Sequence, residues 1–276
     1  MAETAEDSIA SGANTPFDTI ASTYDDVFSE SPIGLAQRNA VWKEMDRSFH
    51  TGDRILEINC GTGIDAIHMA RRGVNVEACD SAPRMIAQAQ DRAGTEHLPV
   101  RFRCLPIERI GELAPHASYD GVLSNFSGLN CISDLDLVAT SLARLVRPGG
   151  RVIVCVFGTF CVWEILWYLS SRDFRKAFRR CRRHGMEAVL APSATVTVHY
   201  RTVGTLTRIF TPHFRLERRQ GVGILVPPSY AANLVSRFPQ LLRVAARIDP
   251  LIGRCPLVRS TGDHTVLTFK RVQEAL

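Results

Sequence analysis

The most constraining feature of the sequence is a short apolar segment that runs into glycines. Residues 54–59 read RILEIN and are followed by Cys60-Gly61-Thr62-Gly63, after which apolar residues recur at helical spacing. Glycines in a loop between a strand and a helix let the backbone approach a ligand where a side chain would clash. The pattern therefore predicts a strand, a ligand-binding loop and a helix, in that order.

Four further apolar runs predict four more strands, with helical patterns between them. The predicted strands cover residues 74–79, 100–104, 119–124 and 151–157. Strands that alternate with helices and read as nearly continuous apolar runs are typical of a parallel, doubly wound α/β sheet. In such a sheet the ligand crevice lies at the carboxyl ends of the strands. Those ends are predicted at residues 59–63, at Asp80, after Cys104 and at residues 124–130.

The pattern changes after Gly158. We expect one long helix over 160–183, a strand over 195–201, a short helix over 203–210, a strand over 214–225, a helix over 229–248 and a final strand over 264–271. The last two strands can join the sheet in antiparallel fashion, and the segments between them would cover the crevice as a cap. Residues 16–276 then form a single domain, with a core of 16–159 plus the last strands and a cap mainly from 160–260. Residues 1–15 are acidic and rich in small residues and have no apolar stretch, which predicts a disordered tail rather than a signal peptide.

The ligand that this crevice would hold contains a ribose. Asp80 ends the second strand seventeen residues after Gly63, and a carboxylate there can accept hydrogen bonds from both ribose hydroxyls. The glycines and the acid are not sufficient to identify the ligand, because the spacing Gly61-x-Gly63-x-x-Ala66 also fits a dinucleotide-binding fingerprint. A nicotinamide-dependent oxidoreductase therefore remains an alternative.

Six sequence blocks in order carry a resemblance to a known superfamily. They are Phe17-Asp18-Thr19-Ile20-Ala21-Ser22-Thr23-Tyr24-Asp25, Ile55-Leu56-Glu57-Ile58, Cys60-Gly61-Thr62-Gly63, Cys79-Asp80-Ser81-Ala82-Pro83-Arg84-Met85-Ile86, Tyr119-Asp120-Gly121-Val122-Leu123-Ser124-Asn125-Phe126 and Leu145-Val146-Arg147-Pro148-Gly149-Gly150-Arg151. Together they resemble the class I S-adenosylmethionine-dependent methyltransferases, in their type 11/25-like small-molecule branch. The resemblance implies a Rossmann-like, doubly wound seven-stranded sheet with a cap inserted after the fifth strand, and S-adenosylmethionine as cofactor.

The resemblance also implies which residues bind the cofactor. They are Tyr24, Glu57, Asn59, Cys60, Gly61, Gly63, Asp80, Ser81, Met85, Pro106, Ile107, Glu108, Asn125 and Phe126. Two of these positions depart from the family pattern. Asn59 replaces the first glycine of E-x-G-x-G-x-G, so its turn must be one that a short amide tolerates. Leu105-Pro106-Ile107-Glu108 replaces the usual acid after the third strand, so either Glu108 or backbone groups would contact the adenine amine.

The acceptor side is less constrained by the sequence. The candidates for a general base are Tyr24, His199, Tyr200 and His213, and none is assigned as catalytic. The candidate acceptor-binding residues are Trp163, Trp167, His199 and Tyr200. The two tryptophans lie one helical turn apart, so they could form an aromatic cage or simply pack the cap onto the sheet. Eight scattered cysteines without CxxC spacing predict neither a disulfide framework nor a metal site.

Charge is unevenly distributed along the chain. Residues 1–150 carry a net charge of −8, and residues 151–276 carry +13. A compositional bias toward arginine or an anionic partner would each explain this excess. Residues 172–184 read as a basic amphipathic helix, which could lie on an anionic membrane or be a solvated face of the cap. No recognition module accompanies the charge, so we expect no nucleic acid partner.

The sequence therefore predicts a cytoplasmic enzyme, with peripheral membrane contact as an option. The apolar run over 152–169 is interrupted by Gly158-Thr159 and Glu164, which disfavours a transmembrane helix. The predicted reaction is methyl transfer to a small or amphiphilic acceptor, a secondary metabolite or a lipid. The first alternative is a non-catalytic cofactor-binding protein at a membrane surface, and the second is the nicotinamide-dependent oxidoreductase. The sequence specifies neither the methylated atom nor the oligomeric state.

Overall fold

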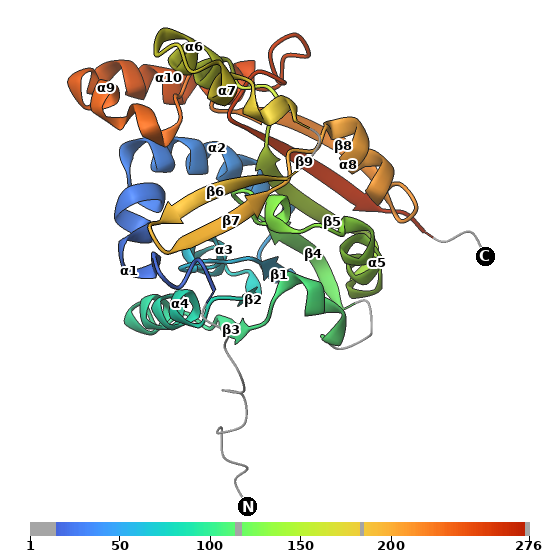
Figure 1. Ribbon diagram of the computed structural model, residues 1–276. Coiled ribbons are helices and arrows are strands. Elements are labelled where there is room, and N and C mark those ends of the chain that lie inside the picture. The colour runs from blue at the N-terminus through green and yellow to red at the C-terminus, as the bar shows by residue number, and fades with distance from the viewer. Residues whose placement is uncertain (1–14, 114–117, 183–184, 274–276) are drawn as a thin grey trace, which may run out of the picture.

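A seven-stranded sheet forms the centre of the molecule (Figure 1). The computed structural model describes residues 15–113, 118–182 and 185–273. The strands follow the order β3-β2-β1-β4-β5-β9-β8. Their bounds are Arg54–Ile58 (β1), Asn75–Asp80 (β2), Arg101–Cys104 (β3), Tyr119–Ser124 (β4), Val146–Phe157 (β5), Phe214–Val222 (β8) and His264–Arg271 (β9). Of the tail predicted over residues 1–15, all but Thr15 lies outside the described residues.

The strand directions confirm the predicted fold class. Strands β1 to β5 pair in parallel, while β9 pairs antiparallel with both β5 and β8. The order of the strands reverses next to β1, since β2 lies on one side of it and β4 on the other. In open α/β sheets this point of reversal is where ligands bind.

Alternating side chains along the strands form two hydrophobic layers, one on each face of the sheet. Ile55 points toward the layer formed with α2 (Pro32–Ser48), α3 (Ile64–Arg71) and α4 (Pro83–Thr95). Leu56 belongs to the opposite layer, formed with η2 (Ile107–Glu112), α5 (Leu135–Leu145) and α8 (Val203–Phe210). This alternation follows from the two-residue period of a strand and leaves the strand ends free for a site.

Two inserted segments, residues 158–202 and 223–263, cover one end of this core, where Figure 1 shows α6, α7, α9 and α10 together. The first holds α6 (Val162–Ser170), α7 (Phe174–Ala177), η4 (Arg179–Cys181), β6 (Met186–Ala191) and β7 (Ala194–Val198). The second holds η5 (Ser229–Ala231), α9 (Ala232–Arg237) and α10 (Pro239–Ile252). Between the two segments, α8 and β8 return to the core.

The prediction of one long helix over 160–183 was wrong. The helix ends at Ser170 because Arg172 adopts a left-handed conformation (φ 57°), and the side chain of Asp173 then caps α7 by accepting from the Lys176 N–H. The helix predicted over 229–248 is also divided, at Phe238-Pro239, since proline cannot donate a helical hydrogen bond. Strand β6, which pairs with β7, was not predicted.

The apolar run over 152–169 is divided between two elements. Its first part completes β5, and its second part lies in α6 beyond Gly158. Across the described ranges, every helix is too short or too polar to span a lipid bilayer.

Candidate functional site

A cavity of about 330 Å³ lies at the carboxyl ends of the parallel strands. Its walls come from the chain up to the end of α1 (Ala21–Tyr24), from α2, from the segments that follow β1 to β4, and from β7. Twelve of the fourteen residues expected to bind a cofactor line it, namely Tyr24, Asn59, Cys60, Gly61, Asp80, Ser81, Met85, Pro106, Ile107, Glu108, Asn125 and Phe126. Glu57 and Gly63 are absent from the lining. The sequence pattern thus brought most of its candidates into one place.

Asn59 shows how the glycine loop tolerates its unusual residue. Its φ is 57°, a left-handed conformation that asparagine adopts more readily than most residues. Its side-chain amide donates to the Asn125 carbonyl at 2.8 Å, and its amide oxygen accepts from the Ser124 hydroxyl at 2.6 Å. Asn59 therefore ties the loop after β1 to the end of β4, a connection that glycine could not make.

Asp80 lies at the end of β2 and holds the same loop from the other side. Its carboxylate accepts the Gly61 N–H at 2.8 Å and the Ala82 N–H at 3.0 Å. Burial raises the pKa of this carboxyl group above its usual value, while hydrogen bonds from the backbone N–H groups of Ala82, Gly61 and Ser81 oppose that shift. Each oxygen has one of these partners, and a carboxylate oxygen can accept a second hydrogen bond. Asp80 can thus receive hydroxyl donors from a ligand.

Two buried acids, Glu57 and Asp65, lie beside the glycine loop. The sequence suggested Glu57 but not Asp65. Asp65, in the first turn of α3, accepts from the Arg38 guanidinium, from Asn125 at 2.8 Å and from the Trp42 indole at 2.6 Å. Burial, with the negative charge of Asp65, raises the pKa of Glu57 well above its usual range. One carboxyl oxygen of Glu57 is buried without a hydrogen-bond partner among the described residues. Arg38, from α2, supplies positive charge to this side of the cavity.

The loop after β4 has a strained backbone. Phe126 and Ser127 both have positive φ, 45° and 70°, and neither is glycine. Such conformations cluster at functional sites, where the surrounding structure maintains them. Here the Ser127 N–H donates to the Cys155 carbonyl at 2.8 Å, and the Arg38 guanidinium lies 4.6 Å from the Phe126 ring centroid. These contacts maintain the strained loop and hold the Phe126 side chain at the cavity wall.

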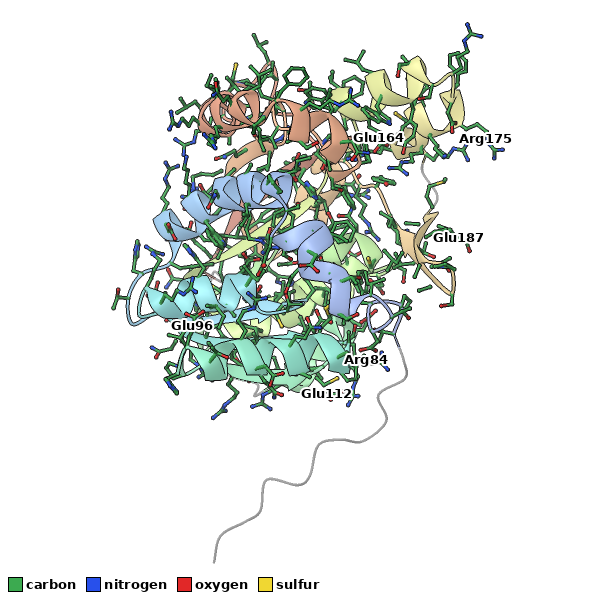
Figure 2. The ribbon with its side chains drawn as sticks, turned by 90° about the vertical axis from the view of Figure 1, so that its left-hand side faces the viewer. Arg84, Glu96, Glu112, Glu164, Arg175 and Glu187 are labelled. Carbon is green, nitrogen blue, oxygen red and sulfur yellow. The ribbon has the colours of Figure 1, made fainter. Side chains whose placement is uncertain are left out.

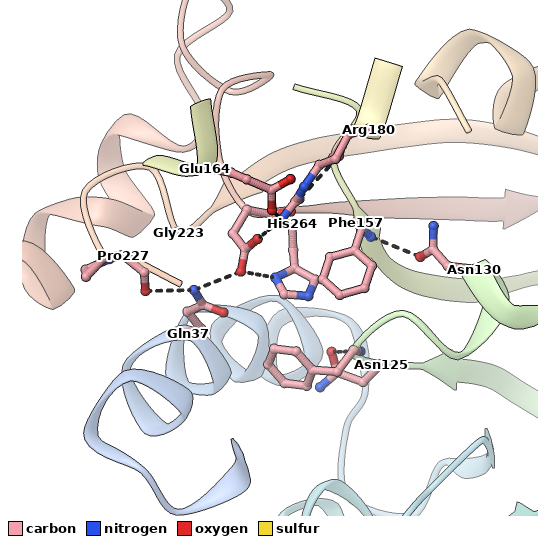
Figure 3. A network of polar contacts seen from close by, with 12 residues as sticks. Gln37, Asn125, Asn130, Phe157, Glu164, Arg180, Gly223, Pro227 and His264 are labelled. Carbon is pink, nitrogen blue, oxygen red and sulfur yellow. Dashed lines mark hydrogen bonds and ion pairs between the residues drawn. The ribbon is translucent and has the colours of Figure 1, made fainter. Parts of the chain in front are cut away.

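A buried polar network around Arg180 and His264 joins the inserted segments to the core (Figure 3). Arg180 donates to Glu164 at 2.8 Å and to the carboxylate of Asp263 at 2.6 Å. His264 lies 3.4 Å from that carboxylate, and its ring meets the Phe126 ring edge to face at 5.3 Å. Burial lowers the pKa of His264, so it is neutral near pH 7. This network lies outside the cavity lining and fixes the inserted segments in place.

Of the candidate bases, only Tyr24 lines the cavity. Burial raises its pKa to about 12, so it holds its proton near neutral pH. His199 donates its backbone N–H to the Asn130 carbonyl, and Tyr200 packs against Phe157. His213 is at the opposite end of the sheet, where its carbonyl accepts from Arg271.

The two tryptophans also lie away from the cavity. The Trp163 indole donates to the Ile224 carbonyl at 3.0 Å, and the Trp167 ring contacts Tyr230. Both therefore join the two inserted segments to each other. The cavity wall instead includes three residues that the sequence did not suggest, Cys131, Ile132 and Val196.

The β6–β7 hairpin forms the outer wall of the cavity. Leu190 and Ala191 at its tip pack with Phe17, Tyr24 and Met85 in one apolar cluster. Its other end is fixed by Asn130, whose amide donates to the His199 carbonyl at 2.8 Å. In Figure 1 the hairpin crosses from the inserted segments toward α1. A ligand in the cavity would thus be enclosed between the hairpin and the sheet.

Sequence comparison identifies the domain that contains this cavity. Residues 55–150 match the family model described as a methyltransferase domain. This part of the chain, about a third of its length, is therefore similar to a methyltransferase domain. The match begins in β1 and ends in β5, so it includes the loops that carry Asn59, Asp80 and Phe126.

Individual relatives of this methyltransferase domain match in part. The chain is 32% identical over 103 residues to a ubiquinone biosynthesis O-methyltransferase of Rhizobium etli, covering 37% of this chain and 40% of that protein. It is 28% identical over 148 residues to a demethylmenaquinone methyltransferase of Mycobacterium marinum, covering 52% and 58%. The chain thus spans less than two thirds of the length of either relative.

A solved structure extends the likeness in fold over most of the chain. An S-adenosylmethionine dependent methyltransferase from Listeria monocytogenes superposes with a TM-score of 0.60 at 16% identity, covering 85% of this chain and 98% of that one. At this identity the likeness concerns the fold alone. The family resemblance and the Rossmann-like fold expected from the sequence are both confirmed.

Proposed function

We propose that this methyltransferase transfers the methyl group of S-adenosylmethionine to a small or amphiphilic acceptor. The observation that carries the proposal is the convergence of the Asp80 carboxylate, the Gly61 backbone and the Phe126 ring on one cavity at the point where the strand order reverses. Its volume of about 330 Å³ falls in the usual range for small-molecule sites.

The polar groups of the cavity fit the chemistry of this cofactor from one end to the other. Asp80 has free acceptor capacity for the two ribose hydroxyls. Met85 and Ile107 offer apolar contact for the adenine ring, with Glu108 and the backbone near Pro106 beside its amine. At the other end, the unpaired oxygen of Glu57 suits an ammonium group, reached through water, and Arg38 suits a carboxylate.

The protein's part in such a reaction is alignment and exclusion of water. When bound, the cofactor supplies a sulfonium methyl with an activated leaving group. Orientation of two reactants can contribute roughly 7–11 kcal/mol to lowering a barrier. Tyr24 and the β6–β7 hairpin close the cavity, and Phe126 borders the donor end. Within the described residues the lining holds no histidine, so an acceptor that needs a general base would have to use a carboxylate such as Glu108.

The acceptor side favours a molecule with an apolar part. Phe126, Ile132 and Val196 present apolar surface there. The two curated relatives carry names from ubiquinone and menaquinone biosynthesis. A hydroxylated aromatic ring with an apolar tail is thus the first acceptor class to test, with secondary metabolites and other lipids as further members of the same amphiphilic class.

Calorimetric titration with S-adenosylmethionine, S-adenosylhomocysteine and NADH tests the cofactor. We expect micromolar binding of the first two, loss of affinity by at least about tenfold in Asp80→Asn because one acceptor oxygen is removed, and no binding of NADH. Asp91→Asn, an exposed acid on α4, is the matched control and should bind normally. Binding of NADH alone would establish the oxidoreductase alternative instead.

Turnover separates the enzyme from a non-catalytic cofactor-binding protein. Radiolabelled methyl groups should appear in an extracted amphiphilic acceptor, such as a demethylated quinol, and should depend on Asp80. Cofactor binding without methyl transfer to quinols, other lipids or secondary metabolites would favour the non-catalytic alternative at a membrane surface.

A further inference from the structure

Helix α10 exposes an unusual row of large apolar side chains. Leu241, Val244, Ile248 and Leu251 are exposed by 65%, 51%, 40% and 69%. Their spacing of three, four and three residues places them on one side of the helix. The opposite side packs inward through Leu242, Ala245 and Ala246 against α2. The apolar row is therefore not part of the core.

A row of arginines accompanies the apolar row. Arg243 and Arg247 are exposed and four residues apart, and Arg237 and Arg254 lie exposed near the ends of the helix. None of these four has an ion pair within the described residues. The one acid between residues 231 and 260 is Asp249, which is 1% exposed and accepts backbone N–H groups from the loop over 223–226. The surface thus combines apolar side chains with uncompensated positive charge.

We propose that the exposed face of α10, with Phe238 at its start, docks on an anionic lipid bilayer. Leucine, isoleucine and phenylalanine can enter the boundary between headgroups and acyl chains, while arginine extends its charged end to the phosphates. A two-fold contact with a second copy would place these arginines against one another with no carboxylate between them. An anionic surface supplies the charge that the face lacks.

The same end of the molecule includes residues 172–184, for which the sequence predicted a basic amphipathic helix that could lie on an anionic membrane. There Arg179 and Arg180 are paired with Glu164, and residues 183–184 lie outside the described chain. Figure 2 shows Arg175 at the outer edge of this end. Because α7 has fewer unpaired charges than α10, the docking face centres on α10.

Co-sedimentation of the full chain with vesicles tests the proposal. We expect binding to vesicles of phosphatidylcholine with a quarter phosphatidylglycerol, much weaker binding to pure phosphatidylcholine, and weakening by added salt. Arg243→Glu with Arg247→Glu should reduce partitioning by at least about tenfold. Leu241→Gln with Ile248→Gln should also reduce it, by about tenfold, without changing the charge.

Leu137→Gln with Arg144→Glu on α5 is the matched control, since both residues are exposed and lie away from α10. This control should bind vesicles normally, and circular dichroism should show every variant folded. Failure of the native chain to bind anionic vesicles would overturn the proposal, as would undiminished binding of both α10 variants. A dimer in analytical ultracentrifugation that Leu241→Gln with Ile248→Gln converts to a monomer would instead assign the face to self-association.

Discussion

Acids with little exposure to solvent occur in two regions of this protein, and their partners differ. Asp80, on the cavity wall, has acceptor capacity left, and Glu57, beside the glycine loop, has an unpaired oxygen. In the inserted segments, Glu164 is paired with two arginines and Asp249 accepts three backbone N–H groups. Glu57 is as buried as Glu164 and Asp249, so burial alone does not mark a functional acid. What separates the two groups is whether the protein itself supplies the partners.

The largest effect is expected where an acid loses its internal partner. Arg180→Met would leave Asp263 and part of Glu164 buried without their positive charge, and breaking such a pair costs about 3–5 kcal/mol. Arg179→Met is the matched control, because its side chain is 31% exposed and Arg180 still neutralises Glu164. Its cost should be about 1 kcal/mol or less. Urea unfolding of both variants, analysed at constant m-value, measures the difference; equal losses would contradict a structural role specific to Arg180.

A smaller effect is expected at Asp249. Asp249→Asn replaces one acceptor oxygen with an NH2 group, which leaves a backbone N–H of the 223–226 loop unsatisfied. This should cost about 1–3 kcal/mol of unfolding free energy and leave affinity for S-adenosylmethionine unchanged. Asp80→Asn should show the reverse pattern, with lower affinity and a smaller loss of stability. If both variants lose the same property, the distinction between the two groups of acids fails.

This contrast also explains which parts of the fold could be predicted from the sequence. In the core, apolar strands, glycine loops and capped helices are local patterns, and strands β1 to β4 were located to within one residue, while β5 begins at Val146, five residues before its predicted start. In the inserted segments, the break at Arg172 depends on a single backbone conformation and the burial of Arg180 on acids 16 and 83 residues away. The spacing of apolar residues predicts neither the break at Arg172 nor the burial of Arg180. The predicted long helix failed for that reason.

The site divides in the same way. Asp80 and the glycine loop follow strands directly, so their position could be read from the sequence. Arg38 and Val196 come from α2 and β7, which reach the cavity only through tertiary packing. Trp163 and Trp167 were candidate acceptor-binding residues because they are aromatic residues of the predicted cap. Their partners are Ile224 and Tyr230 in the other inserted segment. The acceptor wall thus depends on contacts that one sequence does not show.

His264 links the two regions and should make stability depend on pH. Its pKa is lowered in the folded state by burial, despite the nearby Asp263, so the unfolded chain binds more protons between the folded pKa and about 6.5. Stability should therefore fall as pH decreases through this window, by at most about 1.4 kcal/mol per pH unit for one group. His264→Gln should flatten the slope, as measured by urea unfolding between pH 7 and pH 5. An unchanged slope would show that His264 titrates alike in both states.

The smallest expected effect concerns the proton on Glu57, and it tests the cavity without altering the fold. Burial and the charge of Asp65 raise the pKa of Glu57, which favours its protonated form in the free protein. A cofactor ammonium group near the unpaired oxygen would lower that pKa, and binding should then release at most about one proton. Calorimetry in buffers of different ionisation enthalpy counts the protons released. Glu57→Gln should release fewer while Asp91→Asn releases the native number. A native count in Glu57→Gln would mean that the cofactor charge does not reach Glu57, and this acid would then belong with the structural ones.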